Sequence, residues 1–186
     1  MRARSSHSGN QVRIAIRCAT FKKTLYMTIN MTKFWDSNYY DNPPLTDKMI
    51  KQAEKELGVK LPDTFLNLLK VQNGGYTKGF AFPMTIKTTW ADNHVPLSEM
   101  FGIVLDKESD SAHNIMQSDY LTQEWGLPKK QVILNGDGHW WITLDYRQSD
   151  IPSIRWIDCE CGEEIHIADS FDDFYNGLVS EDEFAE

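Results

Sequence analysis

The clearest structural signal in this chain is the run Val132-Ile-Leu-Asn-Gly-Asp-Gly-His-Trp-Trp-Ile-Thr-Leu-Asp-Tyr-Arg147. Its first apolar residues, 132–134, predict a strand. The polar residues 135–138 come next, and two glycines among four residues favour a tight turn. The alternating residues 139–146 predict a second strand that returns antiparallel to the first.

The faces of this second strand carry different side chains. The expected core face holds Trp140, Ile142, Leu144 and Tyr146, and the other face holds His139, Trp141, Thr143 and Asp145. Because adjacent strand residues point opposite ways, Trp140 and Trp141 can both be buried only if both sheet faces are covered. Two arrangements remain open. Either a Trp is exposed as an interface anchor, or helices cover one face and the 85–110 loop covers the other.

Two more strand-like segments follow, at residues 153–159 and 165–168. Short loops join them to the strand at 139–146, so together they predict a three-strand antiparallel meander. Ser170 then stands at the N-cap position of a final helix. The apolar residues of that helix recur at helical spacing and should dock on the sheet: Phe171, Phe174, Tyr175 and Leu178.

The N-terminal half predicts two short helices. Thr46 is a suitable N-cap for the first, and Gly58 stands where a left-handed C-terminal residue belongs. Pro62 can open the second helix, and the run Asn73-Gly-Gly75 should end it. The expected buried face of the second helix holds Phe65, Leu66, Leu68, Leu69 and Val71.

The middle of the chain is predicted more coarsely. Residues 80–83 suggest a short strand, and residues 85–110 suggest a loop with a short strand at 103–105. Residues 111–125 suggest a helix with Ile115, Met116, Tyr120 and Leu121 inside. Helices flanking an antiparallel or mixed sheet predict an α+β fold.

Charge divides the chain into a basic start and an acidic body. Residues 1–30 hold six basic side chains and no acidic one, so residues 31–186 hold 13 basic and 27 acidic side chains, a net charge of −14. We expect residues 1–30 to be a disordered extension or a segment upstream of a true start at Met27 or Met31. A transit peptide is the alternative. Residues 31–180 should form a single domain, followed by an acidic tail at 181–186.

Composition narrows the classes of partner and compartment. No apolar run approaches the roughly 20 residues that a membrane span needs. Three cysteines are too few for a disulfide framework, which predicts a reducing, cytoplasmic setting. An acidic body repels nucleic acid and anionic membrane, so neither is an expected partner. The same charge attracts basic proteins, although plain solubility would also explain it.

Three possible chemistries fit the sequence poorly. The turn at 135–138 lacks the further oxygen ligands of a calcium loop. Cys159 and Cys161 form one tight pair, whereas a structural zinc site wants two separated pairs. His139, Asp145 and Ser153 could be imagined as a hydrolase triad, but no G-x-S-x-G turn is present. We therefore expect no catalytic residues, no metal site and no cofactor.

Several motifs in this order resemble the SUKH superfamily, specifically its Smi/Knr-like branch, the cell-wall assembly regulator family. The N-terminal motifs are Leu61-Pro-Asp-Thr-Phe-Leu66 and Asn73-Gly-Gly75. The C-terminal motifs are Gly126-Leu-Pro128, Ile133-Leu-Asn-Gly-Asp-Gly-His-Trp-Trp-Ile142, Leu144-Asp-Tyr-Arg147, Pro152-Ser-Ile154, Asp158 and Ile167-Ala-Asp-Ser-Phe-Asp-Asp-Phe174. The resemblance covers roughly residues 45–180.

This resemblance implies a sheet with flanking helices and a role in binding. In bacteria it implies an immunity protein that neutralises a cognate toxin, often a nuclease. In eukaryotes it implies a scaffold in cell-wall signalling. The family has no known catalytic residues, so none is transferred to this chain.

We therefore expect a cytoplasmic, non-catalytic immunity protein or antitoxin whose partner is a basic toxin, with a nuclease the leading candidate. A scaffold or regulatory interaction module is the alternative, and a hydrolase using His139 and Asp145 is a remote one. If the polar sheet face is open, the expected binding surface comprises Asp137, His139, Trp141, Asp145, Arg147, Asp158 and Glu160.

Overall fold

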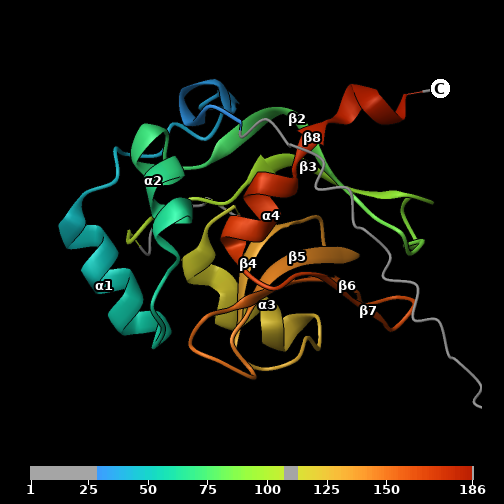
Figure 1. The fold of residues 1–186 in the computed structure, drawn as a ribbon. Coiled ribbons are helices and arrows are strands. Elements are labelled where there is room, and N and C mark those ends of the chain that lie inside the picture. Colours follow the sequence, from blue (N-terminus) through green and yellow to red (C-terminus); the bar gives the residue numbers. More distant parts are fainter. Residues whose placement is uncertain (1–28, 107–112, 186) are drawn as a thin grey trace, which may run out of the picture.

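The computed structural model describes residues 29–106 and 113–185. Within them, two antiparallel sheets pack together with helices around them (Figure 1). The α+β prediction is confirmed. In the part of the chain that the structure describes, no helix is long and apolar enough to cross a membrane.

The predicted meander is confirmed, and it has a fourth strand. It runs in the order β4 (Gln131–Gly136), β5 (Trp140–Asp145), β6 (Ser153–Asp158) and β7 (Glu163–Ala168). The segment expected at 132–134 is longer than predicted, because a bulge between Ile133 and Asn135 lets pairing continue to Gly136.

Helix α4 (Phe171–Gly177) follows the meander as predicted. The Ser170 hydroxyl caps it by accepting a hydrogen bond from the Asp173 backbone N–H. Phe171, Phe174 and Tyr175 are buried, so the predicted stripe docks as expected. Beyond it, β8 (Val179–Ser180) pairs with the first sheet, and Glu181–Phe184 form a 3₁₀ helix at the start of the expected acidic tail.

The first sheet consists of β1 (Trp35–Ser37), β2 (Gly75–Pro83) and β3 (His94–Met100), with β8 also paired to β2. Strand β3 lies within the segment predicted as loop. Its third residue, Pro96, has no N–H to donate, but β3 lies at the edge of the sheet, where a missing N–H is tolerated.

The strand predicted at 103–105 is wrong. Ile103 and Val104 are buried, but asparagine side chains satisfy their backbone groups instead of a neighbouring strand. The Ile103 N–H donates to Asn73 Oδ1 at 2.8 Å, and the Asn73 amide donates back to the Ile103 carbonyl at 2.8 Å. Asn114 makes the equivalent pair of bonds with Val104. Two buried asparagines thus replace a strand here.

The predicted helices form, with small differences. In α1 (Asp47–Leu57), Thr46 accepts from the Met49 N–H, and Gly58 ends the helix with φ of +69°. Helix α2 (Asp63–Val71) begins after Pro62, and its last residue, Val71, is exposed although we expected it to be buried.

Only part of the helix predicted at 111–125 can be compared, because residues 111–112 lie outside the described ranges. A 3₁₀ turn (Ile115–Gln117) leads into α3 (Ser118–Glu124). Ile115 is buried as expected, whereas Tyr120 is exposed.

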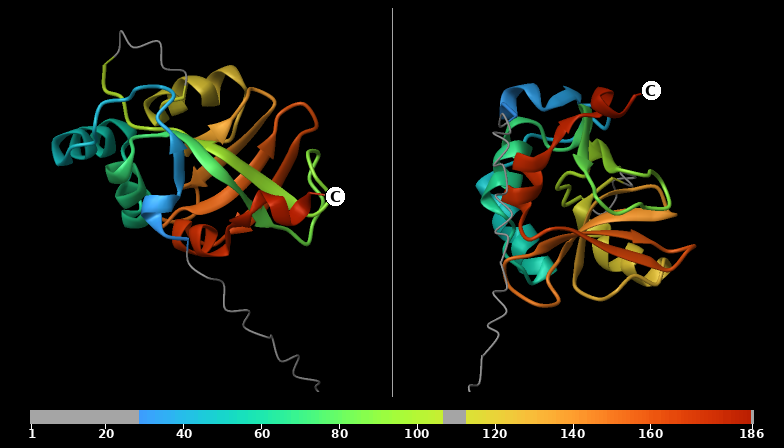
Figure 2. Two further views of the ribbon diagram at one scale, coloured as in Figure 1. Left: turned by 90° about the horizontal axis from the view of Figure 1, so that it is seen from above. Right: turned by 45° about the vertical axis from the view of Figure 1, so that its right-hand side comes forward.

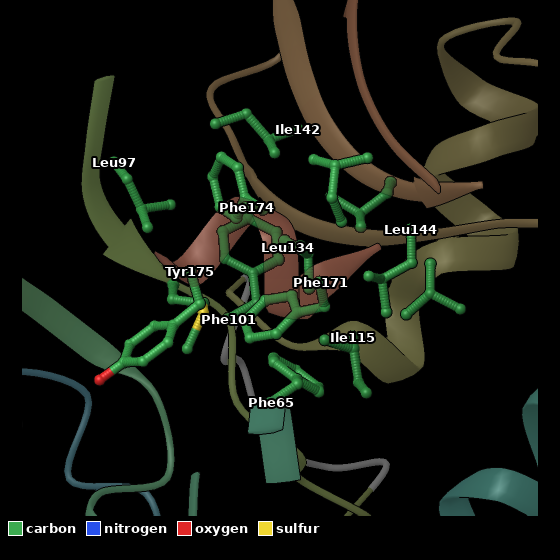
Figure 3. Close-up of a cluster of buried hydrophobic side chains, with 14 of the residues drawn as sticks. Phe65, Leu97, Phe101, Ile115, Leu134, Ile142, Leu144, Phe171, Phe174 and Tyr175 are labelled. Atoms are coloured by element: carbon green, nitrogen blue, oxygen red, sulfur yellow. The ribbon is translucent and has the colours of Figure 1, made fainter. Parts of the chain in front are cut away.

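The hydrophobic core lies between the meander on one side and β3, α2 and α4 on the other. Figure 3 shows Ile142 and Leu144 of β5 facing Phe171 and Phe174 of α4. Leu97 of β3 and Phe65 of α2 close the same cluster from the other side. Figure 2 shows α3 on the opposite face of the meander from the first sheet. Both faces of β5 are therefore covered, and all six of its residues are buried.

Candidate functional site

The residues of the expected binding surface do not form one patch. They divide between the two ends of β5, which are about 17 Å apart for a strand of this length. Asp137, His139, Asp158 and Glu160 lie at the end where the β4–β5 and β6–β7 turns meet. Asp145 and Arg147 lie at the other end.

The packing of β5 shows whether Trp140 and Trp141 are both buried. Trp140 is 8% exposed and Trp141 is 3% exposed, so the arrangement with both faces covered is the one observed. The alternative arrangement, with an exposed Trp on β5 as an interface anchor, is therefore wrong. Trp141 has almost no exposed surface that a partner could contact. The cover agrees with the expected one: the loop at 84–93, which overlaps the expected 85–110 loop, lies over the Trp140 face, and Trp125 at the end of α3 lies over Trp141.

Two exposed tryptophans stand beside this pair, and neither was predicted from the sequence. Trp90 is 58% exposed, and its ring centroid lies 5.6 Å from that of Trp140. Trp125 is 40% exposed, 6.2 Å from Trp141 and against Gly138. We call this region the turn-end surface; it comprises Trp90, Trp125, Asp137, His139, Asp158, Glu160 and Glu163.

The β4–β5 turn holds two of the predicted residues. Asp137 Oδ1 accepts a hydrogen bond from the His139 backbone N–H at 3.0 Å, which is consistent with the predicted tight turn. His139 Nδ1 lies 2.8 Å from Glu160 Oε1, and both side chains are more than half exposed. The His139 and Glu160 side chains therefore present polar groups to solvent.

Asp158 supports this surface from beneath. It is buried, and its carboxylate accepts from Thr89 Oγ1 at 2.5 Å and from the Cys161 N–H at 2.8 Å. Burial alone would raise the pKa of Asp158. The hydrogen bonds from Thr89, Cys161 and Glu160 outweigh burial and lower its pKa, so the carboxylate is held in its charged form.

The far end of β5 holds a separate ionic cluster. Asp145 accepts from Arg147 Nη2 at 2.7 Å and from Gln131 Nε2 at 3.0 Å, and Arg155 Nε lies 3.4 Å away. Arg147 also binds Glu164. Burial opposes ionisation of Asp145, but the hydrogen bonds from Arg147 and Gln131 prevail and lower its pKa. Asp145 and Arg147 are thus structural partners of each other.

The remaining chemistries considered from sequence find no assembled site. His139 binds Glu160, whereas Asp145 and Ser153 face each other at the opposite end of the strands, so the imagined triad does not form. Across residues 29–106 and 113–185, no three His, Cys, Asp or Glu side chains gather as metal ligands would. Burial raises the pKa of the Cys159 thiol, and the neighbouring Asp158 carboxylate raises that of Cys161, so neither favours the thiolate.

A groove of about 720 Å³ lies elsewhere, between the end of α1 and the edge of β4. Its lining mixes lysines such as Lys51, Lys55 and Lys130 with Glu54 and Asp119. The residues of the expected binding surface do not line it. The groove therefore offers no support for the sequence-based site.

Acidic side chains are concentrated in the C-terminal third. Residues 131–186 hold 14 acidic and two basic side chains, a net of −12. The two basic residues are Arg147 and Arg155, and both are bound in the Asp145 cluster. The body's negative charge therefore belongs mainly to the meander and to the C-terminal segment beyond it.

No curated protein and no solved structure matches the chain significantly. The model of one family, the SMI1/KNR4 family (SUKH-1), matches residues 44–177, which include both sheets apart from β1 and β8. That match covers well over half of the chain. The protein is therefore a member of the SMI1/KNR4 family (SUKH-1).

Proposed function

We propose that this protein is a non-catalytic immunity protein that binds and neutralises a cognate basic toxin, with a nuclease as the expected type. The observation that carries the proposal is the charge of residues 131–186, whose two cations are both bound internally. A nuclease must bind phosphate and is therefore commonly basic, so its positive electrostatic potential would complement the negative potential of this protein.

The mechanism would be occlusion. The acidic turn-end surface would compete with nucleic acid for the basic cleft of the toxin. Long-range attraction would raise the association rate, and contacts among the exposed aromatic and acidic groups would slow dissociation. We place this encounter in the cytoplasm, where a nuclease would reach its substrate.

The test starts from the gene beside the one that encodes this chain. A large protein with a C-terminal nuclease-like domain is the expected neighbour, and that domain would be expressed with and without this chain. We expect co-expression to restore growth, and equimolar full-length protein to abolish nucleic acid cleavage in vitro. Cleavage that continues at a tenfold excess would overturn the proposal.

One outcome would favour the scaffold alternative. If the chain binds the neighbouring protein tightly without lowering its activity, it acts as an interaction module and not as an inhibitor. Calorimetry measures the binding and the cleavage assay measures inhibition, so the two roles separate in one set of samples.

A further inference from the structure

The loop between β2 and β3 places an aromatic ring on the surface of the molecule. Trp90 is more than half exposed, yet its ring is supported from behind by Trp140. Trp140 in turn stacks on Trp156 with a centroid separation of 4.7 Å and an interplanar angle of 12°. Trp156 is fully buried, so three rings form a column from the surface into the core.

The loop that carries Trp90 is held in shape by its own hydrogen bonds. The Met84 N–H donates to the Asn93 carbonyl at 2.7 Å and closes its base. Thr88 is buried at the tip, where its hydroxyl accepts from the N–H groups of Trp90 and Ala91. An exposed ring held in this way loses little conformational entropy when a partner binds.

Thr89 ties the loop to the meander. Its hydroxyl donates to Asp158 at 2.5 Å, and its backbone N–H donates to Glu163 Oε2 at 3.1 Å. In Figure 1 the β2–β3 loop and the β6–β7 turn lie at the same end of the molecule, as these bonds require. Thr89, the residue next to Trp90, therefore binds two carboxylates that belong to a different sheet.

The charge around Trp90 selects its occupant. Asp158 is buried, but the β6–β7 turn that follows it carries Glu160, whose side chain is more than half exposed. The lysine of the loop, Lys87, is already paired with Asp92 at 2.6 Å. A ring with carboxylates at its border attracts a cation to its face. An arginine suits this place best, because its planar guanidinium can stack on the indole while its N–H groups donate to carboxylates.

We propose that Trp90 is the central anchor of the partner interface and that it receives an arginine side chain from a basic protein, bordered by Glu160 and Glu163. This inference rests on the proposed function for the identity of the partner. It adds the residue and the chemistry by which the partner is recognised, and it moves the interface from the face of β5 to the tip of the β2–β3 loop.

The first experiment uses the full chain, labelled with ¹⁵N, and hexa-arginine amide as the probe. The chain has six tryptophans, and W90F identifies the indole N–H signal of Trp90. We expect this signal to shift most during the titration at low salt. If the shifts instead concentrate on the acidic residues of α4 and the chain end, with Trp90 unmoved, the inference is wrong.

Hexa-lysine amide tests the choice of arginine. It carries the same charge but cannot stack a planar group on the ring, so we expect it to bind several-fold more weakly. Equal affinities for the two peptides would overturn the stacking of a guanidinium on Trp90.

Variants then locate the contact. We expect W90A to lower hexa-arginine affinity about tenfold. Y39A is the control, because Tyr39 is also exposed but contacts Tyr76, at the other end of β2. We expect T89A to lower affinity partly by releasing the loop, and T85A in the same loop to have no effect. Thermal unfolding by circular dichroism checks that each variant remains folded.

The outcomes separate this inference from the function it rests on. If W90A neutralises a toxin as strongly as the unchanged chain does, the proposed function holds but Trp90 is not part of the interface. A peptide that binds at Trp90, with no toxin neutralised, would remove the function and keep an arginine-binding surface.

Discussion

At the residue scale, buried polar side chains join distant segments of the chain, which the sequence motifs did not indicate. Asn73 was predicted only as part of the segment that ends α2. In the structure its amide donates to the carbonyls of Pro43 and Ile103, and its oxygen accepts from the Ile103 N–H. One side chain therefore joins three separate segments of the chain.

Replacing Asn73 should destabilise the fold. N73A removes three hydrogen bonds and leaves buried backbone groups unpaired, which should lower the free energy of unfolding by about 3 kcal/mol. Urea denaturation followed by circular dichroism measures the change. N67A on the exposed face of α2 is the control and should be nearly neutral. A loss below about 1 kcal/mol for N73A would contradict the structural role.

Asp145 should make stability depend on pH. Its pKa is lowered in the folded protein, so its contribution is present above the unfolded pKa of about 3.9 and is lost as pH falls through the folded value. D145N removes the buried one of the two carboxylates that Arg147 binds and should cost about 3 kcal/mol at neutral pH. The difference from the unchanged chain should shrink below about pH 4 in urea melts. D150N, in the exposed loop nearby, is the control and should be nearly neutral at neutral pH.

At the element scale, glycines decide where strands and helices end, but for different reasons. Gly58 ends α1 with a positive φ, and a Cβ there would meet open space. Gly136 ends β4, and a Cβ there would lie 2.4 Å from the Trp140 carbonyl oxygen and 2.4 Å from the Trp141 ring. Gly58 is therefore needed for its positive φ. Gly136 is needed because the β4–β5 hairpin packs closely against the Trp141 indole, where there is no room for a Cβ.

The two glycines should therefore respond differently to alanine. G58A should cost about 1 kcal/mol from backbone strain alone. G136A should cost clearly more, because backbone and a large ring must both move. Differential scanning calorimetry of the two variants compares them directly. Equal losses would mean that Trp141 can give way and that the hairpin tip is less tightly packed than the structure indicates.

At the scale of the whole molecule, charge is unevenly distributed. Residues 131–186 carry a net of −12 out of the −14 of residues 31–186. A partner of opposite charge would be drawn to the meander half, and the turn-end surface lies there. The position of an acidic residue within this half should then matter as well as its charge.

Charge reversal at two sites separates position from net charge. E160K and D172K change the net charge equally, but Glu160 lies on the turn-end surface and Asp172 lies on α4. We expect E160K to slow association with the toxin several-fold at about 20 mM salt and little at about 0.5 M. D172K should have a smaller effect in stopped-flow measurements. Equal effects would show that only the total charge acts.

The sequence alone determined several helix boundaries and the strands of the meander. Thr46, Gly58 and Ser170 marked helix boundaries because capping depends on neighbouring backbone groups. The alternation along β5 correctly separated its two sets of side chains, since a strand's geometry forces it. The motifs along residues 44–177 were also sufficient to indicate the family.

Only the tertiary structure decided which side chains reach solvent. Burial depends on what packs from elsewhere in the chain, so Trp141 and Asp145 became interior residues. The same packing binds Thr89 to Asp158 and Glu163 and leaves the adjacent Trp90, which no sequence motif singled out, exposed on the surface. These contacts join residues about 70 positions apart, and local periodicity carries no information about such pairings.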